Sequence, residues 1–248
     1  MNRFARFAAS ALALSLVPAM LMGCGKKEAS TGSDLDYIKQ KGTFVVGITD
    51  FAPMDYQDAD GSWIGFDADM AKAFAESLGV TAEFVEIDWD NKILELDSKT
   101  IDCVWNGMTL TAEVTSAMEC SNAYCNNAQV VIVPADKASE YQTVESVKDL
   151  TFAAEAGSAG EAAVAADEFL SQASYTSVVK QTDALLEVKS GAADAAVMDF
   201  VLANTLAGTG DYSDLMVIPD LELSVEEEPE DDRNTHYLGR EYMYLSLI

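Results

Sequence analysis

The sequence predicts an α/β protein made of two similar lobes that face a common cleft. Short apolar runs typical of buried strands alternate with segments of helical periodicity from Tyr37 onward. The segment Leu94–Asp102, LELDSKTID, is also echoed 92 positions later by Leu186–Asp194, LEVKSGAAD. Each copy lies where a predicted helix ends and a predicted strand begins. Polar residues follow both strands, so the echo places polar groups at two strand ends, a layout typical of a binding cleft.

The first lobe is expected over residues 35–134. Its predicted strands, taken from short apolar or alternating runs, are 44–48, 82–87, 103–105 and 130–134. A helix between the first two strands is predicted by Met70, Ala73, Phe74 and Leu78. Gly79 suits the position just after this helix, and Asp90 or Asn91 is expected to cap the next one.

The second lobe is expected over residues 135–220, and the chain is predicted to cross between the lobes in the polar segment 135–147. Its predicted strands are 151–154, 175–179 and 195–198. Its predicted helices are 161–170 and one that begins at Thr182 or Asp183 and ends at Gly191. The lobe therefore repeats the strand and helix alternation of the first.

Residues 1–23 have the features of an export signal. Two arginines precede an apolar run that is short for a membrane span, and the run ends in LMGC, closing on Cys24. This ending is similar to a bacterial lipobox, in which the cysteine becomes the lipid-modified first residue of the mature protein. Residues 24–34 are polar and predict a tether. We expect an extracytoplasmic protein held at the cell membrane by lipid on Cys24 alone, with an ordinary secretory signal as the alternative.

Composition argues against several kinds of partner. The formal net charge of −27 at pH 7 repels the phosphates of nucleic acids, so no nucleic-acid binding is expected. The single histidine, His236, and the lack of zinc-like cysteine spacing argue against a metal site, and no cofactor is expected. Cys103 lies in an apolar strand and is predicted to pack in the core. Whether Cys120 and Cys125 form a disulfide is left open by their spacing.

Several short motifs, taken in order, carry a family resemblance. They are Gly65-Phe66-Asp67, Ile101-Asp102, Asn106-Gly107-Met108-Thr109-Leu110-Thr111, Ser121-Asn122-Ala123-Tyr124, and Gly157 with Asp199. With them, residues 35–227 resemble an extracellular solute-binding protein of an amino-acid-type ABC transporter. The resemblance implies a two-lobed, periplasmic-binding-protein-like fold with hinge strands. It also implies a monomer that captures an amino acid, a derivative or a small amine and delivers it to ABC permease subunits without catalysing a reaction.

The resemblance implies ten ligand-binding positions. Phe51 and Trp89 match aromatic residues that pack on the ligand, with plain packing in the core as the alternative for each. Asn106, Gly107 and Thr109 match a loop that offers backbone and hydroxyl groups to the ligand. A second-lobe segment of the family is matched by Gly157, Ser158, Ala159 and Gly160. The last four form a turn at a helix N-terminus, where backbone amides can receive a carboxylate. Asp199 matches the acid that pairs with the α-amino group of the ligand.

The chain departs from the family at one ligand-binding position. Val114 stands where the family has an arginine that grips the α-carboxylate of the ligand through two hydrogen bonds. Removing such a partner typically costs about 2 to 5 kcal/mol. Glu113 and Glu155 add negative charge near the cleft, and no cation is evident to balance them. We therefore expect a ligand that is net cationic or lacks a free α-carboxylate, with a neutral or polar amino acid held by the second-lobe amides as the alternative.

The C-terminal segment is the second departure. The family is expected to return to the first lobe with a strand and then closing helices, and residues 221–248 show neither pattern. This segment is predicted to be a return segment with an atypical tail, as a shifted reading frame or a truncated gene would produce.

Two other function classes stay open from the sequence. One is a ligand-sensing module for a signalling partner. The other is a dehydratase or lyase on the same fold, with Glu113 or Glu155 as its acid or base.

Overall fold

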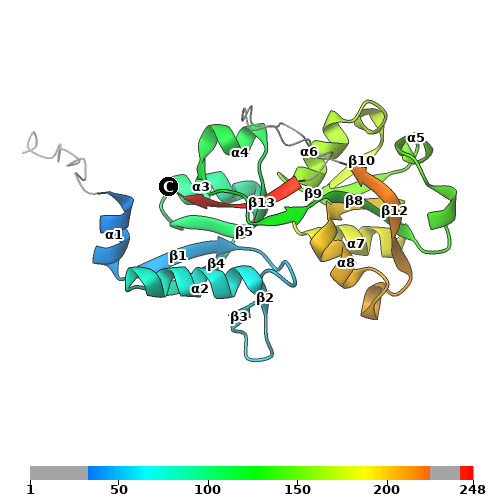
Figure 1. Ribbon diagram of the computed structural model, residues 1–248. Helices are drawn as coiled ribbons and strands as arrows, with labels where there is room; N and C mark the ends of the chain where they lie inside the picture. The colour runs from blue at the N-terminus through cyan, green and yellow to red at the C-terminus, as the bar shows by residue number, and fades with distance from the viewer. Residues whose placement is uncertain (1–32, 224–240, 248) are drawn as a thin grey trace, which may run out of the picture. The chain divides into compact units, whose positions relative to one another are not determined.

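The computed structural model describes residues 33–223 and 241–247. The predicted signal peptide, Cys24 and most of the tether lie outside the described residues, as do residues 224–240 of the tail. In the part that is described, no helix has both the length and the apolar character needed to cross a bilayer. The fold is α/β, with two mixed sheets and one small two-stranded sheet (Figure 1).

The first sheet has the strand order β4-β1-β5-β13-β6, and β7 pairs with β13. Its strands are β1 (Thr43–Ile48), β4 (Thr81–Glu86), β5 (Cys103–Thr109), β6 (Glu119–Cys120), β7 (Cys125–Asn127) and β13 (Glu241–Leu247). β1 runs parallel to β4 and β5, and β13 runs antiparallel to β5. The other elements before β8 are α1 (Asp34–Lys41), β2 (Tyr56–Gln57), β3 (Trp63–Ile64), α2 (Phe66–Leu78), η2 (Trp89–Asn91), α3 (Lys92–Asp97) and α4 (Ala112–Ala117).

Helices cover both faces of the first sheet because its strands are apolar on both sides. On one face, Phe44 and Val46 of β1 pack in one cluster with Ala71 and Ala75 of α2. On the other face, Val104 of β5 packs with residues of α3 and α4. Such two-sided burial is typical of parallel strands in α/β proteins.

The structure confirms the helix predicted before Gly79 and shows which of its residues face the sheet. α2 ends at Gly79 in the left-handed conformation, with φ of 77°, as the sequence predicts. Its buried apolar residues are Ala68, Ala71 and Ala75, whereas Met70 is 38% exposed. Small side chains let a helix lie close to a sheet, so the alanine face meets the strands. Phe74 of the predicted stripe also packs on them, against Phe44 and Trp105.

The second sheet has the strand order β10-β9-β11-β8-β12. Its strands are β8 (Gln129–Pro134), β9 (Phe152–Glu155), β10 (Tyr175–Val178), β11 (Ala195–Asp199) and β12 (Leu215–Leu223). Its helices and helical turns are η3 (Ala138–Glu140), α5 (Val144–Val147), α6 (Ala159–Ala166), η4 (Leu170–Gln172), α7 (Gln181–Ser190), α8 (Phe200–Leu206) and η5 (Gly210–Tyr212). β9 runs parallel to β10 and β11, while β8 runs antiparallel to β11 and β12.

The alternation of side chains along β8 divides the core of the second lobe into two layers. Val130 and Ile132 pack in a cluster with residues of α7 and α8. Val131 and Val133 point to the opposite face and pack with residues of α6. Because successive strand residues face opposite sides, one strand supplies both layers. Figure 1 shows these helices around the second sheet.

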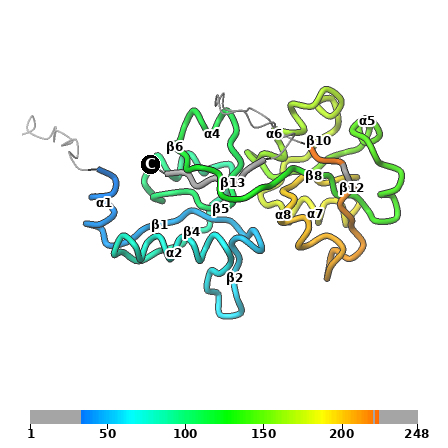
Figure 2. The backbone as a smooth tube through the Cα atoms, viewed as in Figure 1, coloured from blue at the N-terminus to red at the C-terminus, as the bar shows by residue number. Residues whose placement is uncertain are grey.

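The boundary between the lobes lies earlier than residue 134, where the sequence analysis placed it. β8 belongs to the second sheet, so the chain leaves the first sheet between β7 and β8, near Ala128. Figure 2 shows the green segment of the chain that runs on through β8. The segment 135–147 then lies wholly within the second lobe, and β12 extends that lobe to Leu223. The apolar run of β8 predicts a buried strand correctly, but such a run does not indicate which sheet accepts it.

The two copies of the echo perform the same structural task in the two lobes. The backbone N–H of Asp102 donates to the carbonyl of Val45 at 2.7 Å, and the N–H of Val45 donates back to the Asp102 carboxylate at 2.7 Å. In the second lobe, the N–H of Asp194 donates to Thr151 at 2.8 Å, and the N–H of Thr151 donates back to the Asp194 carboxylate at 3.0 Å. Each aspartate thus fastens the start of a strand to the neighbouring parallel strand. Lys41 adds an ion pair of 2.6 Å to Asp102 only.

The tail contributes a strand that the sequence analysis did not predict. β13 pairs antiparallel with β5 in the first sheet, so the chain does return to the first lobe. Residues 242–247, YMYLSL, include the aromatic type favoured in strands, but the run is short and gives no periodicity that separates it from other apolar runs. Pairing with β13 satisfies the backbone groups along the edge of β5 that faces away from β1.

Candidate functional site

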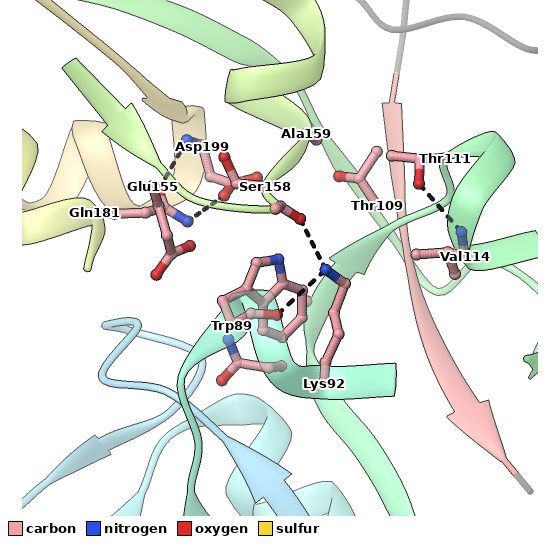
Figure 3. A pocket seen from close by; sticks show the side chains of 13 residues that line it. Trp89, Lys92, Thr109, Thr111, Val114, Glu155, Ser158, Ala159, Gln181 and Asp199 are labelled. Carbon is pink, nitrogen blue, oxygen red and sulfur yellow. Dashed lines mark hydrogen bonds between the residues drawn. The ribbon is translucent and has the colours of Figure 1, made fainter. Parts of the chain in front are cut away.

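A cavity that is partly open to solvent is lined mainly by residues at the carboxyl ends of β5, β9 and β11 (Figure 3). Parallel strands in α/β folds commonly place binding groups at these ends. The lining residues are Trp89, Lys92, Asn106, Gly107, Thr109, Thr111, Val114, Glu155, Gly157, Ser158, Ala159, Gln181 and Asp199. The cavity therefore combines groups from both sheets of the chain.

Of the ten ligand-binding positions that the sequence analysis proposes, eight line this cavity and two do not. Phe51 is only 1% exposed and packs in the apolar cluster that includes Met54 and residues of the second sheet. A Cβ atom at Gly160 would lie 3.0 Å from Gln129 Oε1, so this glycine lets α6 approach β8 closely. Neither residue lines the cavity, because Phe51 packs in the core and Gly160 lies against β8.

Asn106 lines the cavity, but hydrogen bonds to Thr49 engage its side chain. Its Nδ2 donates to Thr49 Oγ1 at 2.6 Å, and its Oδ1 accepts from the Thr49 N–H at 2.7 Å. These bonds tie the end of β1 to β5, so the amide shapes the cavity floor by holding two strand ends together.

The turn after β9 is built as a helix N-terminus. Ser158 caps α6, and its hydroxyl accepts from the Glu161 N–H at 3.1 Å. In return the Glu161 carboxylate accepts from the Gly157 N–H at 2.7 Å. Gly157 has a φ of 66°, and a Cβ atom there would lie 2.9 Å from Asp90 Oδ1. Only glycine combines this left-handed backbone with so close an approach of the first lobe.

Lys92 provides a cation in the cavity, which corrects the expectation that none is present. Its side chain is 3% exposed, and its Nζ donates to the carbonyls of Trp89 at 3.2 Å and Gly157 at 2.8 Å (Figure 3). The ammonium also lies 5.0 Å from the centre of the Trp89 ring, within the range of a cation–π contact. Burial lowers the pKa of Lys92, and the charges of Glu113 and Glu155 among others oppose that shift.

Asp199 is held in place by three side-chain amides. Its carboxylate accepts from Gln129 at 2.9 Å, and also from Asn127 and Gln181, while its own N–H donates to Gln181 Oε1 at 3.0 Å. The residue is 8% exposed, and burial raises its pKa while the three amides lower it. The amides orient the carboxylate and leave it on the cavity wall.

Glu155 is a second acid on the same wall. It ends β9, is 4% exposed and lies near Asp199. Burial first, and then the charge of Asp199, raise the pKa of Glu155 to about 8, although Lys92 opposes this. Glu155 therefore holds its proton to a higher pH than an exposed glutamate does.

Two lining residues, Lys92 and Gln181, have no role in the sequence analysis. Lys92 follows Trp89 by three residues, and side chains at that spacing share one face of a helical turn, so the position of Trp89 could have indicated it. No comparable signal marks Gln181. It comes directly after Lys180. Lys180 is the N-cap of α7, so the prediction of Thr182 or Asp183 as that cap is wrong.

The described residues contain no group of three or more His, Cys, Asp or Glu side chains placed to hold a metal ion. Cys103, Cys120 and Cys125 are free thiols, so the open question of a bond between the last two is answered without a disulfide. Cys103 is fully buried in the core, as its apolar strand predicts.

The chain is similar to known bacterial binding proteins in sequence and in structure. A sequence profile described as bacterial extracellular solute-binding proteins, family 3, matches residues 44–207. The arginine-binding extracellular protein ArtP of Bacillus subtilis is 27% identical over 203 residues, which are 81% of this chain and 75% of ArtP. The structure of holo ArgBP from T. maritima has a TM-score of 0.71 at 30% identity, over 86% of this chain and 85% of that one.

One similar protein is an enzyme. The cyclohexadienyl dehydratase of Pseudomonas aeruginosa is 29% identical over 116 residues, which are 46% of this chain and 43% of the dehydratase.

Proposed function

Because the chain belongs to the bacterial extracellular solute-binding proteins, family 3, we propose that it captures an amino acid or a closely related amine and delivers it to the permease subunits of an ABC importer. ArtP, which is named as an arginine-binding protein, supports an amino-acid ligand. The two-sheet architecture, with one cavity lined from both sheets, supports capture between two lobes.

The observation that carries the proposal is the fixed carboxylate of Asp199 on the cavity wall. Three amides hold it, so it is oriented before any ligand arrives. A charge-assisted hydrogen bond from a ligand ammonium to such a carboxylate is stronger than a neutral one, and more so in a buried site. We assign the α-amino group of the ligand to Asp199, with Glu155 beside it.

Lys92 changes the class of ligand that we expect. The hypothesis of a ligand without a carboxylate rests on a cavity without a cation, and that premise is wrong because Lys92 lines the wall. Lys92 and Asp199 place a basic and an acidic side chain on the same wall, with Glu155 as a second acid. A cavity of this kind suits a zwitterionic amino acid, and ionisation of Glu155 would add the second negative charge that a basic amino acid needs.

Thermal unfolding of the purified chain with L-arginine, L-histidine, L-glutamate and agmatine tests the proposal. A true ligand at 100 times its Kd adds about 2.7 kcal/mol to the free energy of unfolding. We expect at least one amino acid of the panel to do so, and calorimetry to give a saturable isotherm for it. A flat response to every compound by both methods would contradict the proposed function.

The membrane anchor and location are part of the proposal. The LMGC segment ending at Cys24 supports export, cleavage before the cysteine and lipid attachment, so that the protein works as an anchored monomer outside the cytoplasm. Mass spectrometry of the protein from bacterial membranes is expected to find lipid-modified Cys24 at the mature N-terminus. An unmodified cysteine in a protein released to the medium would contradict the anchor and leave the ligand proposal intact.

A second candidate function has one observation in its favour. Glu155 holds a proton near neutral pH in a buried cavity, which suits a general acid, and one similar protein is a dehydratase. We propose binding without catalysis as the main function, because ArtP and ArgBP cover far more of the chain than the dehydratase does. Product formation from cyclohexadienyl acids, lost in Glu155→Gln, would reverse this order.

A further inference from the structure

Lys92 is a buried basic residue that is held by groups without a net charge. Among the residues that the structure describes, the ion pairs within 4.0 Å do not include it. Its Nζ is instead held by two carbonyls, those of Trp89 and Gly157, and by the face of the Trp89 ring. Carbonyl groups orient an ammonium but carry no net charge, so the positive charge stays available to an anion.

Lys92 complements the two acidic residues on the cavity wall, Glu155 and Asp199. Of the 13 described residues that line the cavity, Lys92 alone has a basic side chain, and Val114 is an apolar part of the same wall. Lys92 begins α3 in the part of the chain that carries the first sheet, while Asp199 ends β11 in the second. A ligand that bridges the cavity thus meets a cation from one sheet and an anion from the other.

We propose that Lys92 receives the carboxylate of the ligand, in place of the arginine that is absent at Val114. The ligand carboxylate replaces the Gly157 carbonyl as the acceptor for Nζ, and this carbonyl lies 2.8 Å away before the exchange. The inference rests on the proposed function and narrows it to ligands with both an ammonium and a carboxylate. A lysine binds as a point charge, whereas an arginine forms a planar fork, so the site tolerates more than one carboxylate orientation.

The test compares ligands that differ only at the carboxylate. L-arginine and L-argininamide, or L-histidine and L-histidinamide if the wild type prefers histidine, are titrated into the full chain by calorimetry. Lys92→Met is expected to weaken binding of the free amino acid by about tenfold or more, as loss of a buried charged partner does, and to change binding of the amide less than about twofold. Lys92→Arg keeps the charge and is expected to retain most of the preference for the free acid.

Lys180→Met is the matched control. Lys180 also joins the two parts of the chain, through an ion pair of 2.5 Å to Glu86, but it does not line the cavity. It is expected to leave the preference for acid over amide unchanged. Equal weakening of both ligands in Lys92→Met, with an unchanged melting temperature, would show that Lys92 only holds the lobes together and would overturn the assignment. A wild type that binds neither compound nor any of the panel would instead overturn the proposed function, and the assignment with it.

Discussion

Replacing Asp199 by asparagine is expected to weaken amino-acid binding by roughly 30-fold or more, the equivalent of at least about 2 kcal/mol. The substitution keeps the shape of the side chain and removes its charge, so the ligand ammonium loses its charge-assisted partner. It also turns an acceptor toward three amide donors into a group that is half donor, which disturbs the network of Asn127, Gln129 and Gln181. Calorimetry with the best amino acid of the panel measures the effect.

Asp136→Asn provides the matched control for this prediction. Asp136 is exposed in the second lobe and its substitution changes the net charge by the same amount. Its Kd is expected to stay within about twofold of the wild type, since an exposed charge outside the cavity contributes little. Binding by Asp199→Asn that equals that of Asp136→Asn would rule out Asp199 as the ammonium partner.

The second large effect concerns stability and pH, through Asp55. This residue is 0% exposed beside Asp67, whose carboxylate accepts from the Tyr124 hydroxyl at 2.9 Å. Burial, and then the charge of Asp67, raise the pKa of Asp55 to about 9, and burial raises that of Asp67 to about 6. In an unfolded chain both groups titrate near 3.9.

Because the folded chain holds the Asp55 proton at pH values where the unfolded chain has released it, the free energy of unfolding falls as the pH rises from about 4 toward 9. Asp55→Asn resembles the protonated acid and removes this contribution. Denaturant unfolding at pH 5 and pH 8 measures the free energy of unfolding of the variant and of the wild type. The variant minus wild-type difference is expected to rise by at least about 1 kcal/mol from pH 5 to pH 8, a conservative equivalent of one pKa unit.

Asp60→Asn, at an exposed position of the same segment, is the control and is expected to show no such pH dependence relative to the wild type. A difference between Asp55→Asn and the wild type that stays constant from pH 5 to pH 8 would mean that Asp55 is ionised in the folded protein throughout this range.

Local signals in the sequence account for most of the elements. The strands at 44–48, 82–87 and 175–179 and the helix before Gly79 appear in the structure within a residue or two of the predicted bounds, because apolar periodicity and glycine at helix ends act over a few residues. The echo is explained in the same way. Asp102 and Asp194 each fasten a strand start to its neighbour, so the repeated motif reports a repeated backbone contact.

Errors appear where a decision depends on distant parts of the chain. The sequence of β8 is equally consistent with a strand of the first or of the second sheet. β13 is recognisable only when the edge of β5 that it pairs with is known. Phe51 shows the same limit at the site. Its residue type suits both a ligand wall and a core, and the structure packs it in the core.

The sequence by itself determined that this chain alternates strands and helices in two related halves, and its family resemblance pointed to Asp199 and to the turn at Gly157 as parts of one site. The tertiary structure alone decided the charge of that site. Lys92 and Gly157 are 65 positions apart, yet Nζ lies 2.8 Å from the carbonyl, and Glu155 acquires its raised pKa only through burial beside Asp199. Charge balance in a cavity depends on distance and on exclusion of water, and neither is encoded in local spacing.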